Sequence, residues 1–222
     1  SVLAVVSTSI QPQDVAIDAS GNFWVPSSSR WLVKVDPSGN LSYVDTGLST
    51  LRNVDADKSG DLFITGMNGT TGVLLEMSPS GQFTTLVQNG LSKPVYMAAD
   101  SSGDLYVSNF GDNTISKIGP GGVISTFVTG LNAPQGLATD TSGNLYVANS
   151  GANDVLMVSP TGTTAIYASG INSPTGLAFD PHCVLYVTYS AVNSVVKVTA
   201  SGAVTTFAQS AAAKPQGMRY DS

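Results

Sequence analysis

Pro134-Gln-Gly-Leu-Ala-Thr-Asp-Thr-Ser-Gly-Asn-Leu-Tyr-Val-Ala-Asn149 is the stretch that decides the fold, because the chain repeats it in altered form. The start of this phrase occurs six times at steps of 39, 43, 40, 40 and 41 residues, beginning at Pro12, Leu51, Pro94, Pro134, Pro174 and Pro215. A period of about 40 residues with short apolar runs and turn residues is typical of repeat architectures. The sequence therefore predicts one repeat domain over residues 1–222.

The fourth unit shows how each repeat is organised. Its apolar runs predict four strands, separated by turns or loops that contain glycine, at residues 137–139, 145–148, 155–158 and 164–167. Short runs joined in this way form a four-stranded antiparallel sheet. Such sheets, repeated at this period, close around an axis as an all-β β-propeller.

A turn with an aspartate at its first place follows the first predicted strand of four units, at Asp18, Asp57, Asp100 and Asp140. A carboxylate there accepts hydrogen bonds from nearby backbone N–H groups, and the glycine three residues later supplies a positive φ. A calcium loop is the alternative, but calcium takes six to eight oxygens and commonly a bidentate acid. The only glutamate, Glu76, lies in a predicted third strand. We expect no cofactor, and a structural or channel-bound calcium ion stays the open alternative.

The segment from Pro134 to Asn149 resembles the NHL repeat of six-bladed propellers. The likeness extends over nearly the whole chain, is strongest in units three to five, and is broken at Asp180-Pro-His-Cys-Val184, where the turn glycine is replaced. The resemblance implies a propeller fold. The family includes extracellular sensor domains, scaffolds, RNA-binding modules and a few enzymes, so the resemblance leaves the function open.

The two chain ends are expected to share the last blade. The sixth unit stops after an inner strand at residues 215–221, and residues 2–7 align with the fourth strand at 164–169. The prediction is five complete blades plus an incomplete closing sixth blade formed by both ends, which removes an open sheet edge. A two-stranded blade, further residues and strands supplied by a second chain remain three ways to complete it.

The composition limits the partners. Charged residues make up 11% of the chain, and 9 Lys and Arg against 15 Asp and Glu give a net charge of −6. Binding to phosphate backbones needs clustered Lys and Arg, so we expect no nucleic acid partner. No apolar run is long enough for a membrane span. Few lysines and many Gly, Ser and Thr residues favour an extracellular or periplasmic location, and we expect Cys183 to be a buried small side chain.

The sequence favours a non-catalytic protein over an enzyme. His182 is the only histidine, whereas a catalytic zinc site takes about three protein ligands. Lactonase-type propellers use an acid near the N-terminus, and no glutamate precedes Glu76. A metal-assisted lyase or lactone hydrolase at the channel mouth is the alternative function, and a purely structural domain is a third.

A binding site is predicted where the inter-blade loops and the loops between second and third strands surround the channel mouth. The expected inner set is mostly uncharged and polar: Gln13, Asn53, Tyr96, Gln135, Thr175 and Gln216. Outside it we place Trp31, Asn68, Phe110, Asn149 and Tyr189, and two charges replace alanine in the inner strands, Asp55 and Arg219. Amides orient a ligand and aromatic rings supply apolar area, which suits a neutral polar ligand such as a glycan, or a protein partner.

Structural roles are the alternative for the same residues. Amides also tie loops together, and aromatic rings also seal the contacts between blades. We assign the aromatic residues that recur at a fixed place in the second strands to packing between blades: Trp24, Phe63, Tyr106, Tyr146 and Tyr186.

Overall fold

The computed structural model describes residues 14–189, 193–209 and 218. They form five four-stranded antiparallel sheets, each built from strands consecutive in the chain. The chain divides into two compact units, residues 1–94 and 95–222. The predicted four-stranded blades are therefore confirmed. The predicted closing blade, at residues 2–7 and 215–221, lies outside the described residues.

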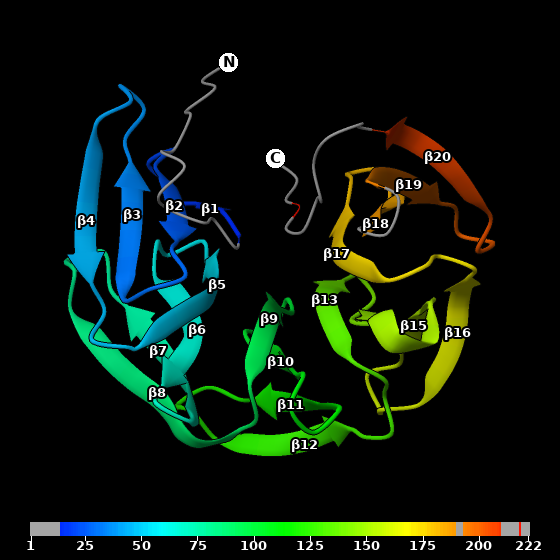
Figure 1. Ribbon diagram of the computed structural model, residues 1–222, viewed down its shortest axis with the longest axis horizontal. Coiled ribbons are helices and arrows are strands. Elements are labelled where there is room, and N and C mark those ends of the chain that lie inside the picture. Colours follow the sequence, from blue (N-terminus) through cyan, green and yellow to red (C-terminus); the bar gives the residue numbers. More distant parts are fainter. Residues whose placement is uncertain (1–13, 190–192, 210–217, 219–222) are drawn as a thin grey trace. The chain divides into compact units, whose positions relative to one another are not determined.

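The first unit contains blades 1 and 2 (Figure 1). The strands of blade 1 are β1 (Ala16–Ile17), β2 (Phe23–Pro26), β3 (Trp31–Val35) and β4 (Leu41–Asp45). The strands of blade 2 are β5 (Thr50–Ala56), β6 (Leu62–Asn68), β7 (Thr71–Met77) and β8 (Phe83–Leu91).

The second unit contains blades 3, 4 and 5. Blade 3 consists of β9 (Pro94–Ala99), β10 (Leu105–Asn109), β11 (Thr114–Ile118) and β12 (Ile124–Val128). Blade 4 consists of β13 (Pro134–Thr139), β14 (Leu145–Asn149), β15 (Asp154–Val158) and β16 (Thr164–Ser169), with a short 3₁₀ helix, Ser150–Ala152, between β14 and β15. Blade 5 consists of β17 (Pro174–Phe179), β18 (Leu185–Tyr189), β19 (Ser194–Val198) and β20 (Val204–Gln209).

The aspartate turns explain why the chain reverses after each first strand. In all five blades one carboxylate oxygen accepts the backbone N–H groups two and four residues later, at 2.8–3.1 Å, from Asp18, Asp57, Asp100, Asp140 and Asp180. The predicted role of these carboxylates is confirmed. In the fifth turn Cys183 replaces glycine and adopts φ 61°. Its side chain is exposed, so the expectation of a buried cysteine is wrong, because this place in the turn points into solvent.

Three of the second-strand aromatic residues, Trp24, Tyr106 and Tyr146, lie in the contacts between neighbouring blades of a unit, as expected. The ring of Tyr146 in blade 4 packs edge-on against Phe179 of blade 5, with centroids 4.9 Å apart. Trp24 of blade 1 belongs to a buried cluster with Leu62, Ile64 and Met77 of blade 2. Blades that are neighbours within a unit therefore bury apolar side chains against each other, and this burial stabilises the unit.

Candidate functional site

Every blade has two ends with different chemistry. At the turn end, five-residue turns join the first strand to the second and the third to the fourth. At the loop end, segments of four residues or fewer join the second strand to the third, and the chain passes to the next blade. Most of the predicted ligand-binding residues belong to the loop end, and their positions are given for each unit separately.

The loop-end amides of the second unit are used inside the protein. Asn149 is buried; its Oδ1 accepts the backbone N–H of Asn132 at 2.7 Å, and its Nδ2 donates to Asp154 at 3.0 Å. Asn109, in the same place of blade 3, donates to Thr114 and Ser116. These contacts hold the loops that connect the strands, which agrees with the structural alternative for Asn149.

Thr175 and Gln135, at the same place of the repeated phrase, differ in how far they are buried. Thr175 is buried, and its hydroxyl lies 2.8 Å from the hydroxyl of Thr188 on the adjacent strand. Gln135 is half-buried and donates a long hydrogen bond of 3.4 Å to the hydroxyl of Ser150. Of these two side chains, only Gln135 keeps exposed polar area for an external ligand.

The aromatic candidates of the second unit divide into half-buried and exposed residues. Tyr96 and Tyr189 are half-buried and pack against the hydrophobic clusters between blades. Phe110, in the loop between β10 and β11, is 46% exposed. The large apolar ring offered by the described loops at this end is therefore Phe110.

In the first unit, Asn53 and Asp14 form a buried polar pair. The Asn53 amide donates to the Asp14 carboxylate, and their exposed fractions are 0% and 6%. Asp55, two residues further along β5, is half-buried, and its carboxylate accepts the backbone N–H of Ala56 at 3.0 Å. These side chains stabilise the inner strand.

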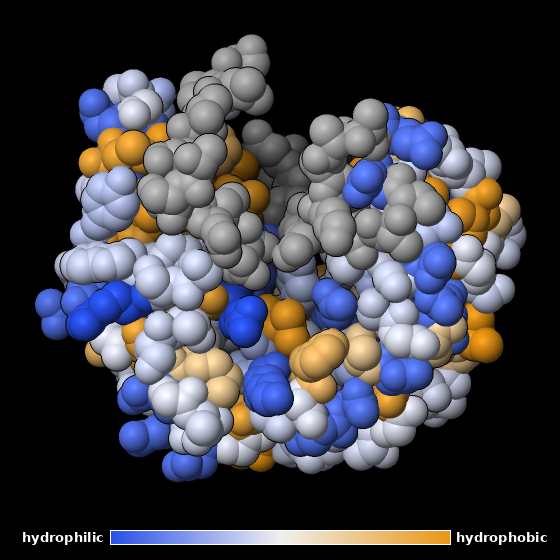
Figure 2. Space-filling model, viewed as in Figure 1, coloured by the Kyte–Doolittle hydropathy of each residue, from blue (hydrophilic) through white to orange (hydrophobic). Residues whose placement is uncertain are grey.

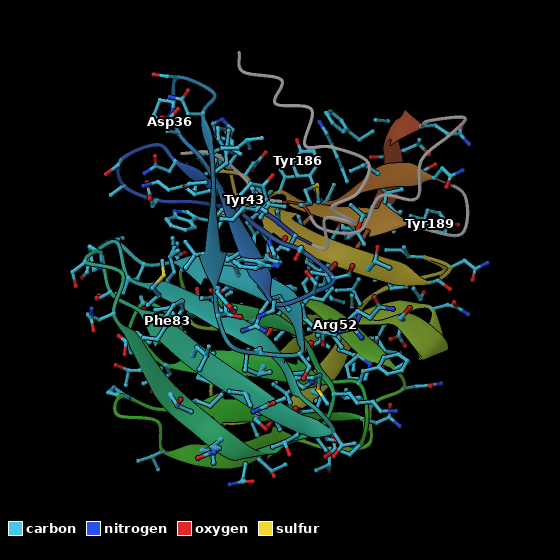
Figure 3. The ribbon with its side chains drawn as sticks, turned by 60° about the vertical axis from the view of Figure 1, so that its left-hand side comes forward. Asp36, Tyr43, Arg52, Phe83, Tyr186 and Tyr189 are labelled. Carbon is cyan, nitrogen blue, oxygen red and sulfur yellow. The ribbon has the colours of Figure 1, made fainter. Side chains whose placement is uncertain are left out.

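Arg52 was missed because the prediction mixed two places of the repeated phrase. The second place holds Gln13, Arg52, Val95, Gln135, Thr175 and Gln216, whereas Asn53 and Tyr96 stand at the third. Arg52 is exposed and Asn53 is buried, so the residue that offers a side chain to solvent here is the arginine (Figure 3). A strict alignment of the six phrases shows this difference. Gln13, Gln216 and Arg219 lie outside the described residues.

Trp31 lies at the start of β3 and is 42% exposed. It shares a sheet face with Tyr43 of β4, which is 55% exposed, because the paired residues Trp31–Asp45 and Val33–Tyr43 lie on the same side of the sheet. Arg30 beside it binds Asp45 through two contacts of 2.6 and 2.7 Å, which raises the pKa of the guanidinium and lowers that of the carboxyl group. Figure 2 shows hydrophobic residues at the upper left, over the end of blade 1 where β3 joins β4 in Figure 1, which is the opposite end of β3 from Trp31.

The first unit has a hollow of about 300 Å³ at its loop end. Uncharged polar side chains provide much of its lining, among them Asn68, Thr71, Gln88 and Asn89. Of the predicted residues, Asn68 is the one that contributes to this hollow. The described residues contain no group of three or more His, Cys, Asp or Glu side chains arranged to hold a metal ion. Nor do they include a helix long and apolar enough to cross a membrane.

No protein-family model and no curated protein sequence matches the chain. Solved structures do match it. A streptogramin B lyase is 16% identical, with 96% of this chain and 75% of that chain covered and a TM-score of 0.83. A chain of a nidogen/laminin complex is 18% identical, with coverages of 95% and 84% and a TM-score of 0.84. A putative gluconolactonase is 20% identical, with coverages of 83% and 73% and a TM-score of 0.70. At these identities the matches show the fold alone, and that fold is the β-propeller.

Proposed function

We propose that this propeller is a non-catalytic binding module that recognises protein partners outside the cytoplasm, each unit through the exposed side chains at its own loop ends. One observation carries the proposal: the loop-end polar side chains Asn53, Asn149 and Thr175 are buried and hydrogen-bonded internally, whereas the large side chains Trp31, Phe110 and Arg52 are exposed.

The exposed residue types favour a protein surface over a sugar as the ligand. Residues that contribute most to protein binding are enriched in Trp, Tyr and Arg. Recognition of a sugar needs free hydrogen-bond donors and acceptors beside an aromatic ring. The internal hydrogen bonds of Asn149 and Thr175 occupy groups that would serve this purpose.

The comparisons are compatible with this proposal and with others. The chain is similar in fold to a protein crystallised in a nidogen/laminin complex, which supports protein binding as a use of this architecture. It is also similar to a streptogramin B lyase and a putative gluconolactonase. The exposed side chains of this protein, Trp31, Phe110 and Arg52, are therefore what favours binding over the other uses of the fold.

A neutral polar ligand is the second candidate, favoured by the hollow of about 300 Å³ at the loop end of the first unit. Its volume is at the lower end of the range for small-molecule sites. Asn68, Gln88 and Asn89 supply uncharged donors and acceptors. A panel of soluble sugars in thermal unfolding tests this candidate, because a ligand at one hundred times its Kd stabilises the folded state by about 2.7 kcal/mol.

Site-specific photocrosslinking tests the proposed protein partner. A photoreactive benzoylphenylalanine replaces Phe110 in one variant and Val123, which is 73% exposed at the turn end of the same blade, in the control. Both variants are exposed to secreted and cell-surface proteins, and crosslinked products are identified by mass spectrometry. We expect a protein that crosslinks from position 110, not from position 123, and is competed by unmodified protein.

Competitor variants decide whether the exposed residues carry the binding. The unmodified Phe110→Ser protein should compete at least about tenfold more weakly for crosslinking from position 110, because it removes a large contact side chain. Arg52→Ser and Trp31→Ser test the loop end of the first unit in the same way, with the photoreactive residue at position 31. Equal crosslinking from positions 110 and 123, or full competition by Phe110→Ser, contradicts the proposal. A melting shift with a sugar and no selective crosslink supports the second candidate instead.

A further inference from the structure

The turn end of the first unit contains a groove that the proposed function does not use. It lies between blades 1 and 2 and has a volume of about 410 Å³. Blade 1 lines it with Trp24, Lys34 and Val44, and blade 2 with Leu62, Met77 and the serine-containing turns. Its size is within the usual range for a small-molecule site.

Blade 1 lacks an aromatic residue that is present in the blades of the second unit. There the second-strand tyrosine packs against a fourth-strand ring at 4.8–5.1 Å, in the pairs Tyr106–Phe127, Tyr146–Tyr167 and Tyr186–Phe207. These rings sit at β-bulges, where the register shifts between the third and fourth strands. In blade 1, β3 and β4 pair without a bulge, and Val44 stands at the place of Phe127. A smaller side chain on an unbulged strand therefore lines the groove together with Trp24.

Lys34 gives the groove its charge preference. Its ammonium lies 5.2 Å from the centre of the Trp24 ring. In blade 3 the equivalent Lys117 pairs with Asp104 at 2.8 Å, but blade 1 has Asn22 at the place of Asp104. Among the residues that the structure describes, Lys34 forms no ion pair. An ammonium group beside a groove with both polar and apolar lining favours a ligand with a negative charge.

The acidic group in the groove is already hydrogen-bonded. The Asp18 carboxylate accepts the Trp24 indole N–H at 2.8 Å, the Asn22 amide, and the backbone N–H groups of Ser20 and Asn22. In the adjoining turn, Oδ1 of Asp57 accepts two backbone N–H groups. The hydroxyl of Ser59 also lines the groove and has no hydrogen-bond partner among the described residues. It is a donor for a bound carboxylate.

We propose that this groove binds a small carboxylic acid with a flat apolar body, whose carboxylate lies near Lys34 and Ser59 and whose body lies against Val44 and the exposed part of the Trp24 ring. The apolar contacts favour burial of the body, and the ammonium distinguishes the acid from a neutral molecule of the same shape. This site is separate from the loop ends, because it lies at the other end of the strands of blades 1 and 2.

Tryptophan fluorescence tests the proposal directly. The chain has two tryptophans, so Trp31→Phe leaves Trp24 as the only indole in the full chain. In this background, sodium benzoate and the neutral benzamide are titrated at constant ionic strength. We expect a saturable change in Trp24 fluorescence with benzoate. The apparent affinity for benzamide should be at least about fivefold weaker, which is the effect of losing one partly solvated charged contact.

Three variants in this background locate the site. Lys34→Met should make the two affinities equal, because it removes the ammonium group. Val44→Phe should weaken both probes at least tenfold, because it places a ring where the other unit has Phe127. Lys197→Met is the matched control, since Lys197 lies over Tyr186 in blade 5, and it should leave both affinities unchanged. Circular dichroism melts check that each variant is folded.

Two results would overturn the proposal. One is equal affinity for benzoate and benzamide in the parent protein, or a non-saturable change. The other is a benzoate preference that survives Lys34→Met. Lys34 is only half-buried, so we expect Lys34→Met to fold. The comparison of benzoate with benzamide in that variant therefore decides the proposal even when Val44→Phe does not fold.

Discussion

The indole Nε1 of Trp24 donates a 2.8 Å hydrogen bond to Oδ2 of Asp18, the carboxylate that also closes the first turn of blade 1. Partial burial alone would raise the pKa of Asp18, but the hydrogen bonds from Trp24, Asn22 and Ser20 lower it. Tyr106, Tyr146 and Tyr186 make the equivalent contact through their hydroxyl groups at 3.2–3.4 Å. The turn aspartate therefore joins local chain reversal to the position of the ring that packs between blades.

Replacing Asp18 with Ala should destabilise the protein more than replacing Asp57 with Ala. Both variants lose the two backbone bonds of a turn, but Asp18→Ala also removes the acceptor of the Trp24 indole N–H and of the Asn22 amide, because blade 2 has Phe63 and Asp61 at these two places. We expect an additional loss of about 1–2 kcal/mol in the free energy of unfolding, measured by urea denaturation at pH 7. Equal losses would show that the bonds to Trp24 and Asn22 contribute nothing.

The same relationship predicts a response to acid. The pKa of Asp18 is lower in the folded protein than the ordinary value of 3.8. The ionised carboxylate therefore stabilises the folded state above that value, and this stabilisation is lost as the pH falls through the folded pKa. The difference in stability between the parent protein and Asp18→Ala should therefore shrink below about pH 4. A difference that stays constant from pH 7 to pH 2 would contradict this origin.

The blades were predictable because their signals are local. The turn from Asp140 to Asn144 and the run from Leu145 to Asn149 lie within ten residues, and aspartate, glycine and alternating apolar residues determine both. Because the chain repeats this unit, the same strand assignment is correct for all five described blades. The bulge at Phe127 has no such local signal, because its sequence neighbours resemble those of Val44, which lies in a regular strand.

The candidate site was less predictable because its hydrogen bonds join distant residues. Asn149 was expected to face a ligand, but the backbone N–H that it accepts belongs to Asn132, 17 residues away. Asn53 is buried against Asp14, 39 residues away. Residue type and spacing do not reveal whether such an amide points into solvent or into the protein. The ligand role of the remaining residues, including Gln135 and Phe110, stays a prediction.

A buried hydroxyl in blade 2 predicts a stabilising substitution. The side-chain oxygen of Thr65 has no hydrogen-bond partner, and the residue is fully buried on β6. Valine has nearly the same shape and no polar atom, so Thr65→Val should raise the free energy of unfolding by about 1 kcal/mol.

Thr188 is the control: its hydroxyl accepts the Gly176 N–H at 2.5 Å and lies 2.8 Å from the hydroxyl of Thr175. Thr188→Val should cost about 1–3 kcal/mol in the same denaturation experiment. A loss of stability in both variants would contradict the unpaired state of Thr65.

The glycine of the repeated phrase has a steric role in the second unit. A Cβ atom on Gly136 would overlap the carbonyl oxygen of Thr175 in the neighbouring blade, so the inner strands β13 and β17 approach closely only without it. Gly136→Ala should reduce the free energy of unfolding by about 1–3 kcal/mol. Gly119→Ala is the matched control, because its Cβ would meet its nearest neighbour at an ordinary 3.5 Å. That control should change stability by less than about 0.5 kcal/mol. Similar melting temperatures for both variants would show that the strands can separate at little cost.

Glu76 breaks a charge pattern that three of the other four described blades share. It pairs with Phe63 across the strands at the place where Lys34, Lys117 and Lys197 pair with their aromatic partners. Burial raises the pKa of Glu76, and the nearby carboxylates of Asp61 and Asp57 raise it further. In blade 3 the corresponding contact is attractive, because Lys117 binds Asp104.

Glu76→Lys should therefore stabilise the protein by up to about 1 kcal/mol at pH 7, the range of a partly exposed ion pair. The pH dependence of the stability of Glu76→Gln distinguishes repulsion between Glu76 and the nearby carboxylates from a general effect of net charge. Because the folded pKa lies above the ordinary value of 4.5, ionisation of Glu76 costs stability as the pH rises through the folded pKa. The advantage of Glu76→Gln over the parent should be absent below about pH 4.5, grow above it, and then remain constant. Lys117→Glu is the reverse control and should destabilise blade 3 in low salt. An advantage of Glu76→Gln that is already complete at pH 4 would rule out repulsion of the ionised glutamate.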